Sequence, residues 1–201
     1  MRLIKMFGLA AIAAVAAMAF VGATPASAAN TQLCTAHTGL TCSSPVSSLH
    51  LVNEGVLRVL NDLNPVLCLS VSLEATPLAL ANPQSVHTTS LEFTGCGTSS
   101  AHNNCLITVE ELPLFNLSKT GLDQGVLTAT NGQLTVLCEN VLFTQTIECT
   151  FDMTGAELAV GGGHATVNQM PLTEVGDDFM CPEEPQLDAL LKGTSAAYVL
   201  G

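Results

Sequence analysis

Hydrophobic and polar residues alternate along short stretches of the chain from residue 49 onward. The clearest stretch, residues 66–74, places Leu67, Leu69, Val71 and Leu73 on one face and an increasingly polar set on the other. A repeat of two residues is the pattern of a half-buried β-strand. We therefore expect a strand here, with these four side chains in the core.

Similar apolar runs, bounded by Gly, Pro and Asn, continue to the end of the chain. They cover residues 91–94, 106–109, 126–130, 134–138, 146–151, 157–160, 165–170, 187–191 and 196–200. Asn131-Gly132 separates two of the runs and predicts a type I′ hairpin turn, because both central residues of that turn need φ > 0. Gly161-Gly162-Gly163 predicts a second hairpin turn.

The spacing of these runs, about 8–12 residues per strand, favours an all-β fold over alternating strands and helices. We expect an antiparallel β-sandwich of about 8–10 strands, immunoglobulin-like or jelly-roll-like. Residues 51–63 leave one alternative open. Their apolar residues fit one face of a short helix, but Gly55 and the β-branched valines fit a strand–turn–strand equally well.

The first 28 residues have the three parts of a secretory signal peptide. Arg2 and Lys5 give a charged start, residues 7–21 are apolar or Gly, and Ala26-Ser27-Ala28 is an A-x-A cleavage site. The apolar run is short for a membrane helix. We expect a mature chain that begins at Ala29, is secreted or held at the cell surface, and has no membrane span. The short, Ala-rich leader is typical of bacteria.

Removing the leader makes the chain more acidic. The remaining 173 residues hold three basic side chains against 17 acidic ones, which is a formal charge of −14. This charge argues against a nucleic-acid partner, which needs a basic face. The hydrophobic content of 48% with only 11% charged residues is typical of a chain that folds around a core.

All eight cysteines lie after the leader: Cys34, Cys42, Cys68, Cys96, Cys105, Cys138, Cys149 and Cys181. An even number in an exported chain predicts disulfides, and no C-x₂-C pair points to a metal site instead. Spacing favours three short-range bridges, Cys34–Cys42, Cys96–Cys105 and Cys138–Cys149. This leaves Cys68–Cys181 as a long-range bridge. We expect the polar residues 29–48 to form an arm with a small disulfide loop outside the core, followed by one domain over residues 49–201.

Several segments together carry a resemblance: L-E-F-T-G-C, N-C-L-I-T-V, L-T-V-L-C…I-E-C-T-F, M-P-L-T, C-P-E-E…L-D-A-L and A-A-Y-V-L. The chain resembles a set of small exported proteins of unknown function, best represented in actinobacteria, with a β-rich, disulfide-containing domain. The resemblance implies secretion and a β fold. It supplies no catalytic residues.

The residues that usually carry hydrolytic chemistry lack their usual patterns. There is no G-x-S-x-G elbow and no H-E-x-x-H. The five histidines are scattered: His37, His50, His87, His102 and His164. We expect no enzyme activity and no cofactor.

Adjacent carboxylates occur at Glu110-Glu111, Asp177-Asp178 and Glu183-Glu184. Neighbours on a strand point to opposite faces, so Glu110 and Glu111 cannot share a cleft without a bulge. Asp177 and Asp178 follow Gly176 and offer oxygen ligands for calcium, but without EF-hand spacing. The chain also has no Trp and one Tyr, which argues against a sugar-binding cleft.

Three roles remain open from the sequence. The first is a non-catalytic protein that binds a partner at the cell surface or builds part of the envelope. The second is a carrier of a small apolar molecule, and the third is a small hydrolase without a recognisable motif. A deep apolar cleft lined by Leu, Met and Phe would favour the carrier. A convergent pocket holding a His bonded to a Ser or an acid would favour the hydrolase.

Overall fold

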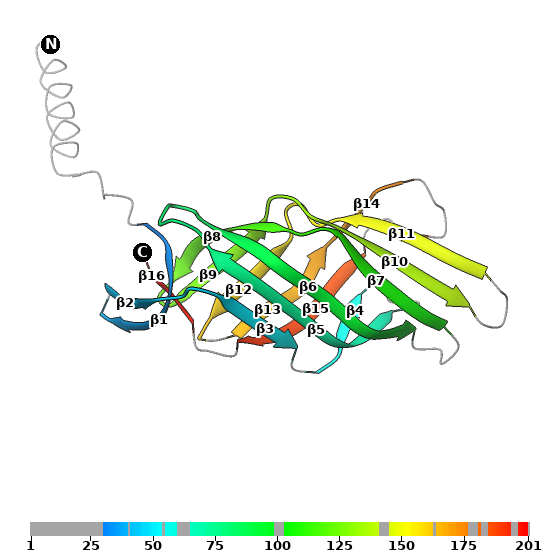
Figure 1. Ribbon diagram of the computed structural model, residues 1–201, viewed down its shortest axis with the longest axis horizontal. Coiled ribbons are helices and arrows are strands. Elements are labelled where there is room, and N and C mark those ends of the chain that lie inside the picture. Colours follow the sequence, from blue (N-terminus) through cyan, green and yellow to red (C-terminus); the bar gives the residue numbers. More distant parts are fainter. Residues whose placement is uncertain are drawn as a thin grey trace, which may run out of the picture.

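The computed structural model describes residues 30–39, 41–53, 55–59, 65–98, 103–140, 145–162, 164–176, 181, 185–193 and 197–200. Within them lie sixteen strands and no helix (Figure 1). The first eight are β1 (Gln32–Thr38), β2 (Thr41–Pro45), β3 (Leu49–Asn53), β4 (Leu57–Val59), β5 (Val66–Pro77), β6 (Gln84–Thr98), β7 (Asn103–Glu111) and β8 (Leu114–Gly121). The others are β9 (Gln124–Ala129), β10 (Gln133–Asn140), β11 (Gln145–Asp152), β12 (Glu157–Gly161), β13 (His164–Pro171), β14 (Thr173–Glu174), β15 (Gln186–Gly193) and β16 (Tyr198–Leu200). The all-β prediction is confirmed. The proposed leader, residues 1–28, lies outside the described residues.

The larger sheet closes into a barrel and not into the sandwich that we expected. Its strands follow the order β6-β8-β9-β12-β13-β15-β3-β5, and β5 pairs again with β6. β4 continues β3 at the same place in the ring, because both pair with β15 and with β5. Every pairing in the ring is antiparallel. Closure pairs most strand edges of the ring, which reduces the aggregation hazard of an open sheet.

Two smaller parts are attached to the barrel (Figure 1). We call β7, β10, β11 and β14 the extension sheet; it continues from the end of β6, where Gly97 pairs with Asn104. We call β1, β2 and β16 the cap sheet. Figure 1 shows the two at opposite ends of the long axis.

The cap sheet contributes to the core, contrary to our expectation for residues 29–48. Leu33 and Val46 are buried and belong to the main hydrophobic cluster. The buried Gln84 of β6 holds the sheet in place, because its Oε1 accepts a hydrogen bond from the Leu33 backbone N–H at 3.3 Å. Although residues 29–48 are mostly polar, Leu33 and Val46 within them are buried in the core.

The ambiguous segment 51–63 is a strand–turn–strand over its described residues, not a helix. β3 and β4 are separated by a kink at which Gly55 has φ 99°. The side chain of Asn53 replaces the missing backbone pairing: its Oδ1 accepts from Val71 N–H at 2.9 Å and its Nδ2 donates to Leu69 O at 3.0 Å. Residues 60–64 lie outside the described part.

The set of side chains that residues 66–74 bury also differs from the predicted one. Val71 and Leu73 are buried as expected, but Leu69 is 72% exposed and Cys68 is buried instead. Alternation is interrupted between Leu69 and Val71, where the Asn53 side chain inserts. A continuous period of two in the sequence therefore does not give one continuous buried face.

One hairpin prediction is confirmed and the other is wrong. Gly161 pairs with His164, so β12 and β13 form the hairpin predicted at the three glycines. In contrast, β9 and β10 do not pair, because the chain at Asn131-Gly132 passes from the barrel to the extension sheet. Asn131 lacks the positive φ of a type I′ turn, and its Oδ1 accepts from Leu114 N–H at 2.7 Å.

All eight cysteines are in disulfides, but only one predicted pairing is correct. Cys34–Cys42 is confirmed. The predicted bridges Cys96–Cys105, Cys138–Cys149 and Cys68–Cys181 are wrong, and the structure has Cys68–Cys96, Cys105–Cys138 and Cys149–Cys181. Two of the observed bridges join directly opposed residues of neighbouring strands, β5 with β6 and β7 with β10. Proximity along the chain fails as a guide because antiparallel pairing brings together cysteines that are 28 and 33 residues apart.

We expect peptide mapping without reduction to recover Cys68–Cys96 and Cys105–Cys138 as separate linked peptides. The test is discriminating because Gly97 pairs with Asn104, which places Cys96 and Cys105 at neighbouring positions on paired strands. Recovery of a Cys96–Cys105 peptide from folded protein would contradict the Cys68–Cys96 and Cys105–Cys138 bridges. Reduced and alkylated protein serves as the control.

We expect Gly125→Ala to destabilise the protein by about 1–3 kcal/mol, the usual range for overpacking. A Cβ at Gly125 would lie 2.8 Å from Ser118 O and 3.0 Å from Val199 Cγ1, so β16 would have to move away from the barrel. Gly121→Ala is the matched control, since its nearest neighbour is the flexible Gln124 side chain at 3.4 Å. Urea unfolding of both variants measures the difference, and equal midpoints would argue against the docking of β16 on β9.

Candidate functional site

The interior of the barrel, which we call the lumen, contains a cavity of about 40 Å³. Its lining is wholly apolar and consists of Leu57, Val71, Leu73, Leu91, Phe93, Pro113, Phe115, Met153, Leu158, Leu187, Ala189 and Leu191. These residues come from β4, β5, β6, β8, β12 and β15 and from the connections after β7 and β11. The lining contains the Leu, Met and Phe side chains that we expected around the deep cleft of a carrier, but the cavity is small.

Strand alternation directs most of these side chains inward. On β15, Leu187, Ala189 and Leu191 are buried while Leu190 is exposed. The small side chain of Ala189 stands between two leucines, which leaves room at the centre of the lumen. An Ala between two inward leucines does not by itself mark a cavity in the sequence, because its effect depends on which strands face β15.

A β-bulge on β6 determines which side chains of this strand face the lumen. Glu74 pairs with Ser90 and Ala75 pairs with Thr88, so Thr89 is an extra residue with no partner on β5. Its Oγ1 donates to Glu74 O at 3.2 Å. Because a bulge shifts alternation by one residue, Thr88 on one side of it is buried in the lumen and Leu91 on the other side lines the cavity.

Leu91 and Phe93 are the only lining residues that are partly exposed. They lie opposite Leu73 and Val71, which are both buried. The cavity therefore approaches the surface beside β6, where two apolar side chains separate it from solvent.

Met153 is held in the lining by the turn between β11 and β12. Its N–H donates to Gly132 O at 2.9 Å, and its carbonyl accepts from Ala156 N–H at 2.9 Å. Asp152 precedes it and accepts a hydrogen bond from Thr154 N–H at 2.7 Å. Hydrogen bonds from the Thr154 side chain and backbone hold the pKa of Asp152 below its usual value.

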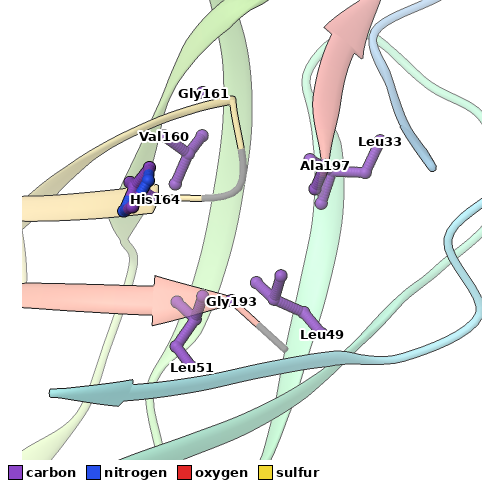
Figure 2. A pocket seen from close by; sticks show the side chains of 8 residues that line it. All are labelled: Leu33, Leu49, Leu51, Val160, Gly161, His164, Gly193 and Ala197. Carbon is purple, nitrogen blue, oxygen red and sulfur yellow. The ribbon is translucent and has the colours of Figure 1, made fainter. Parts of the chain in front are cut away.

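The opposite end of the lumen is filled. Figure 2 shows Leu33 and Ala197 of the cap-sheet side facing Leu49, Leu51 and Val160 of the barrel. The gap between them measures about 10 Å³, which is at the lower limit for a single water molecule. His164 stands at its edge and is exposed. The lumen is thus closed beneath the cap sheet.

A shallow groove of about 520 Å³ lies on the outer surface, over β12, β13 and the turn between β8 and β9. Asp123 and Tyr198 line it, and His37 lies beside them, with its Nε2 3.7 Å from Asp123 Oδ1 and its ring 4.9 Å from that of Tyr198. The distance of 3.7 Å between His37 Nε2 and Asp123 Oδ1 is too long for a hydrogen bond. Among the described residues that line the groove there is no Ser or Cys, and its hydroxyl groups come from Thr120, Thr166 and Tyr198.

The other residues singled out in the sequence are not brought together. His50 lies 4.0 Å from Glu74 at the surface, and His87 is exposed. Glu110 is the extra residue of a bulge, and both it and Glu111 are exposed. In the described part of the chain, no group of three or more His, Cys, Asp or Glu could hold a metal ion.

Several of these predictions fall on residues that the structure does not describe. They are His102, Asp177, Asp178, Glu183 and Glu184. The calcium hypothesis for Asp177 and Asp178 therefore stays a prediction. Over the described residues, no helix is long and apolar enough to span a membrane.

Comparison with protein-family models, with curated proteins and with solved structures finds no match to this chain.

Proposed function

We propose that the protein is an exported, non-catalytic binding protein that carries a small apolar molecule in its lumen. The observation that supports this role best is the cavity itself, which is lined by apolar side chains of the barrel strands and their connections. Ligand sites in proteins are typically concave and mostly apolar. Export is part of the proposal, and four disulfides are consistent with an extracellular location.

The volume of the cavity sets how a ligand enters. About 40 Å³ is well below the roughly 300–1,000 Å³ of typical ligand pockets. A ligand therefore widens the site by moving Leu91 and Phe93 outward, since both are already partly exposed. Burial of an apolar ligand and of these two side chains against it supplies the binding free energy.

The alternatives have less support. A cysteine hydrolase would need a free thiol, and all eight cysteines are bonded. The His37–Asp123 pair lies beside a groove whose lining includes no Ser or Cys. A purely structural envelope role would favour a filled core, and it gives no reason for the apolar cavity beside Ala189.

Fluorescence titration with N-phenylnaphthylamine, a neutral apolar dye, tests this role. We expect saturable binding to the wild-type protein, because the dye becomes fluorescent in apolar surroundings. We expect Ala189→Leu to weaken binding at least tenfold, because the added carbons fill the lumen. Ala159→Leu is the matched control, since Ala159 is exposed on the outer face of β12, and we expect it to bind as the wild type does.

Absence of saturable binding to the wild type would contradict the carrier role, and so would unchanged binding by Ala189→Leu. If Ala189→Leu does not fold, Leu158→Ala provides the opposite change. It enlarges the same cavity, so we expect it to bind the dye more tightly than the wild type. Circular dichroism monitors folding throughout.

A further inference from the structure

Among the buried polar residues that the structure describes, Thr88 is the one whose side chain has no hydrogen bond. Three polar residues are buried among those described: Thr31, Gln84 and Thr88. Thr31 donates to Asn82 Oδ1 at 3.3 Å, and Gln84 bonds both Leu33 and Leu78. Thr88 has no measurable exposure, and its Oγ1 has no partner within the described part of the chain. Buried polar groups are nearly always satisfied, so this hydroxyl requires an explanation.

The strand register places Thr88 next to the lumen cavity. Thr88 pairs with Ala75 of β5, which faces inward like Leu73 two residues before it. On β6 itself, the next residue that faces inward after the bulge is Leu91. On the other side, the β6–β8 ladder ends with His87 opposite Leu114, and one further step places Thr88 beside Pro113. Leu73, Leu91 and Pro113 all line the cavity. Pro113 has no N–H, so its backbone offers Thr88 no donor.

The geometry points to an amphipathic ligand, and this inference rests on the carrier role proposed above. We propose that the molecule has an apolar body in the lumen cavity and one uncharged oxygen group, a hydroxyl or a carbonyl, hydrogen-bonded to Thr88 Oγ1. A hydroxyl side chain can donate to a carbonyl or exchange a hydrogen bond with an alcohol.

The lining also selects against a charged end group. No basic residue is among the described residues that line the cavity. An ionised carboxylate would be buried beside the Thr88 hydroxyl without a cation, and desolvation of such a charge is far more costly than that of a neutral oxygen. The favoured class is therefore neutral alcohols and ketones with an aliphatic or cyclic body, and not fatty-acid anions.

Competition against bound N-phenylnaphthylamine tests this inference with a matched pair, octanol and octane. We expect Thr88→Val to weaken octanol binding about tenfold, the effect of losing one buried hydrogen bond. Octane binding stays unchanged, because Val has nearly the same shape as Thr. In the ligand-free state we expect Thr88→Val to raise the melting temperature, since it removes an unpaired hydroxyl. Thr94→Val, an exposed position on the same strand, is the control and changes neither affinity.

The outcomes separate this inference from the carrier role. Equal effects of Thr88→Val on octanol and octane, with both bound by the wild type, would overturn the role of Thr88 and leave the carrier role standing. Failure of both compounds to displace the dye from a wild type that binds it would also overturn the inference. Failure of the wild type to bind dye, octanol or octane would overturn the carrier role with it. If Thr88→Val does not fold, Thr88→Ser and Thr88→Ala give the same comparison, because both lose the methyl group and only Ser keeps the hydroxyl.

Discussion

The long antiparallel ladder between β5 and β6 is the constraint on which the rest of the structure depends. It runs from Val66 opposite Thr98 to Pro77 opposite Val86, and it is the pairing that closes the ring. β6 is longer than any other strand, and its two ends serve different partners: β8 of the barrel at one end and β7 of the extension sheet at the other. The Cys68–Cys96 disulfide fixes this ladder near the junction with the extension sheet. Without the ladder there would be neither a closed lumen nor a connection to the extension sheet.

The same ladder determines the chemistry of the lumen. The bulge at Thr89 changes which residues of β6 face inward, so that a hydroxyl and two large apolar side chains are presented from one strand. Uninterrupted alternation beyond Thr88 would have directed Ser90 and Glu92 into the barrel instead. Bulges often occur where a protein must redirect a side chain toward a site. The bulge therefore accounts both for the buried hydroxyl of Thr88 and for the apolar side chains of Leu91 and Phe93 in the candidate site.

The sequence predicts the strands well because alternation is a local property. Nearly all predicted runs are strands, and the three-glycine hairpin is confirmed. Ring closure, the disulfide pairing and the path at Asn131-Gly132 depend on which distant strands pair, and no local pattern specifies this. The run 114–121 was missed although Phe115 and Leu117 alternate with polar residues. The cavity was beyond prediction for the same reason: Ala189 is unremarkable until β15 is placed opposite the strands that surround the lumen.

The packing of the lumen lowers the stability of the folded protein, and simple substitutions there would raise it. An empty cavity of about 40 Å³ costs about 1 kcal/mol, and an unsatisfied buried hydroxyl costs about 1–3 kcal/mol. Together these are a considerable part of the roughly 5–15 kcal/mol that stabilises a typical domain. Disulfides closing loops of 28–33 residues contribute about 3–4 kcal/mol each in the chain-entropy model, which offsets such a loss. Local rules of packing and polar satisfaction are broken mainly at functional sites. Here two of them are broken close together in the lumen, and a ligand with an apolar body and a single oxygen group would restore both.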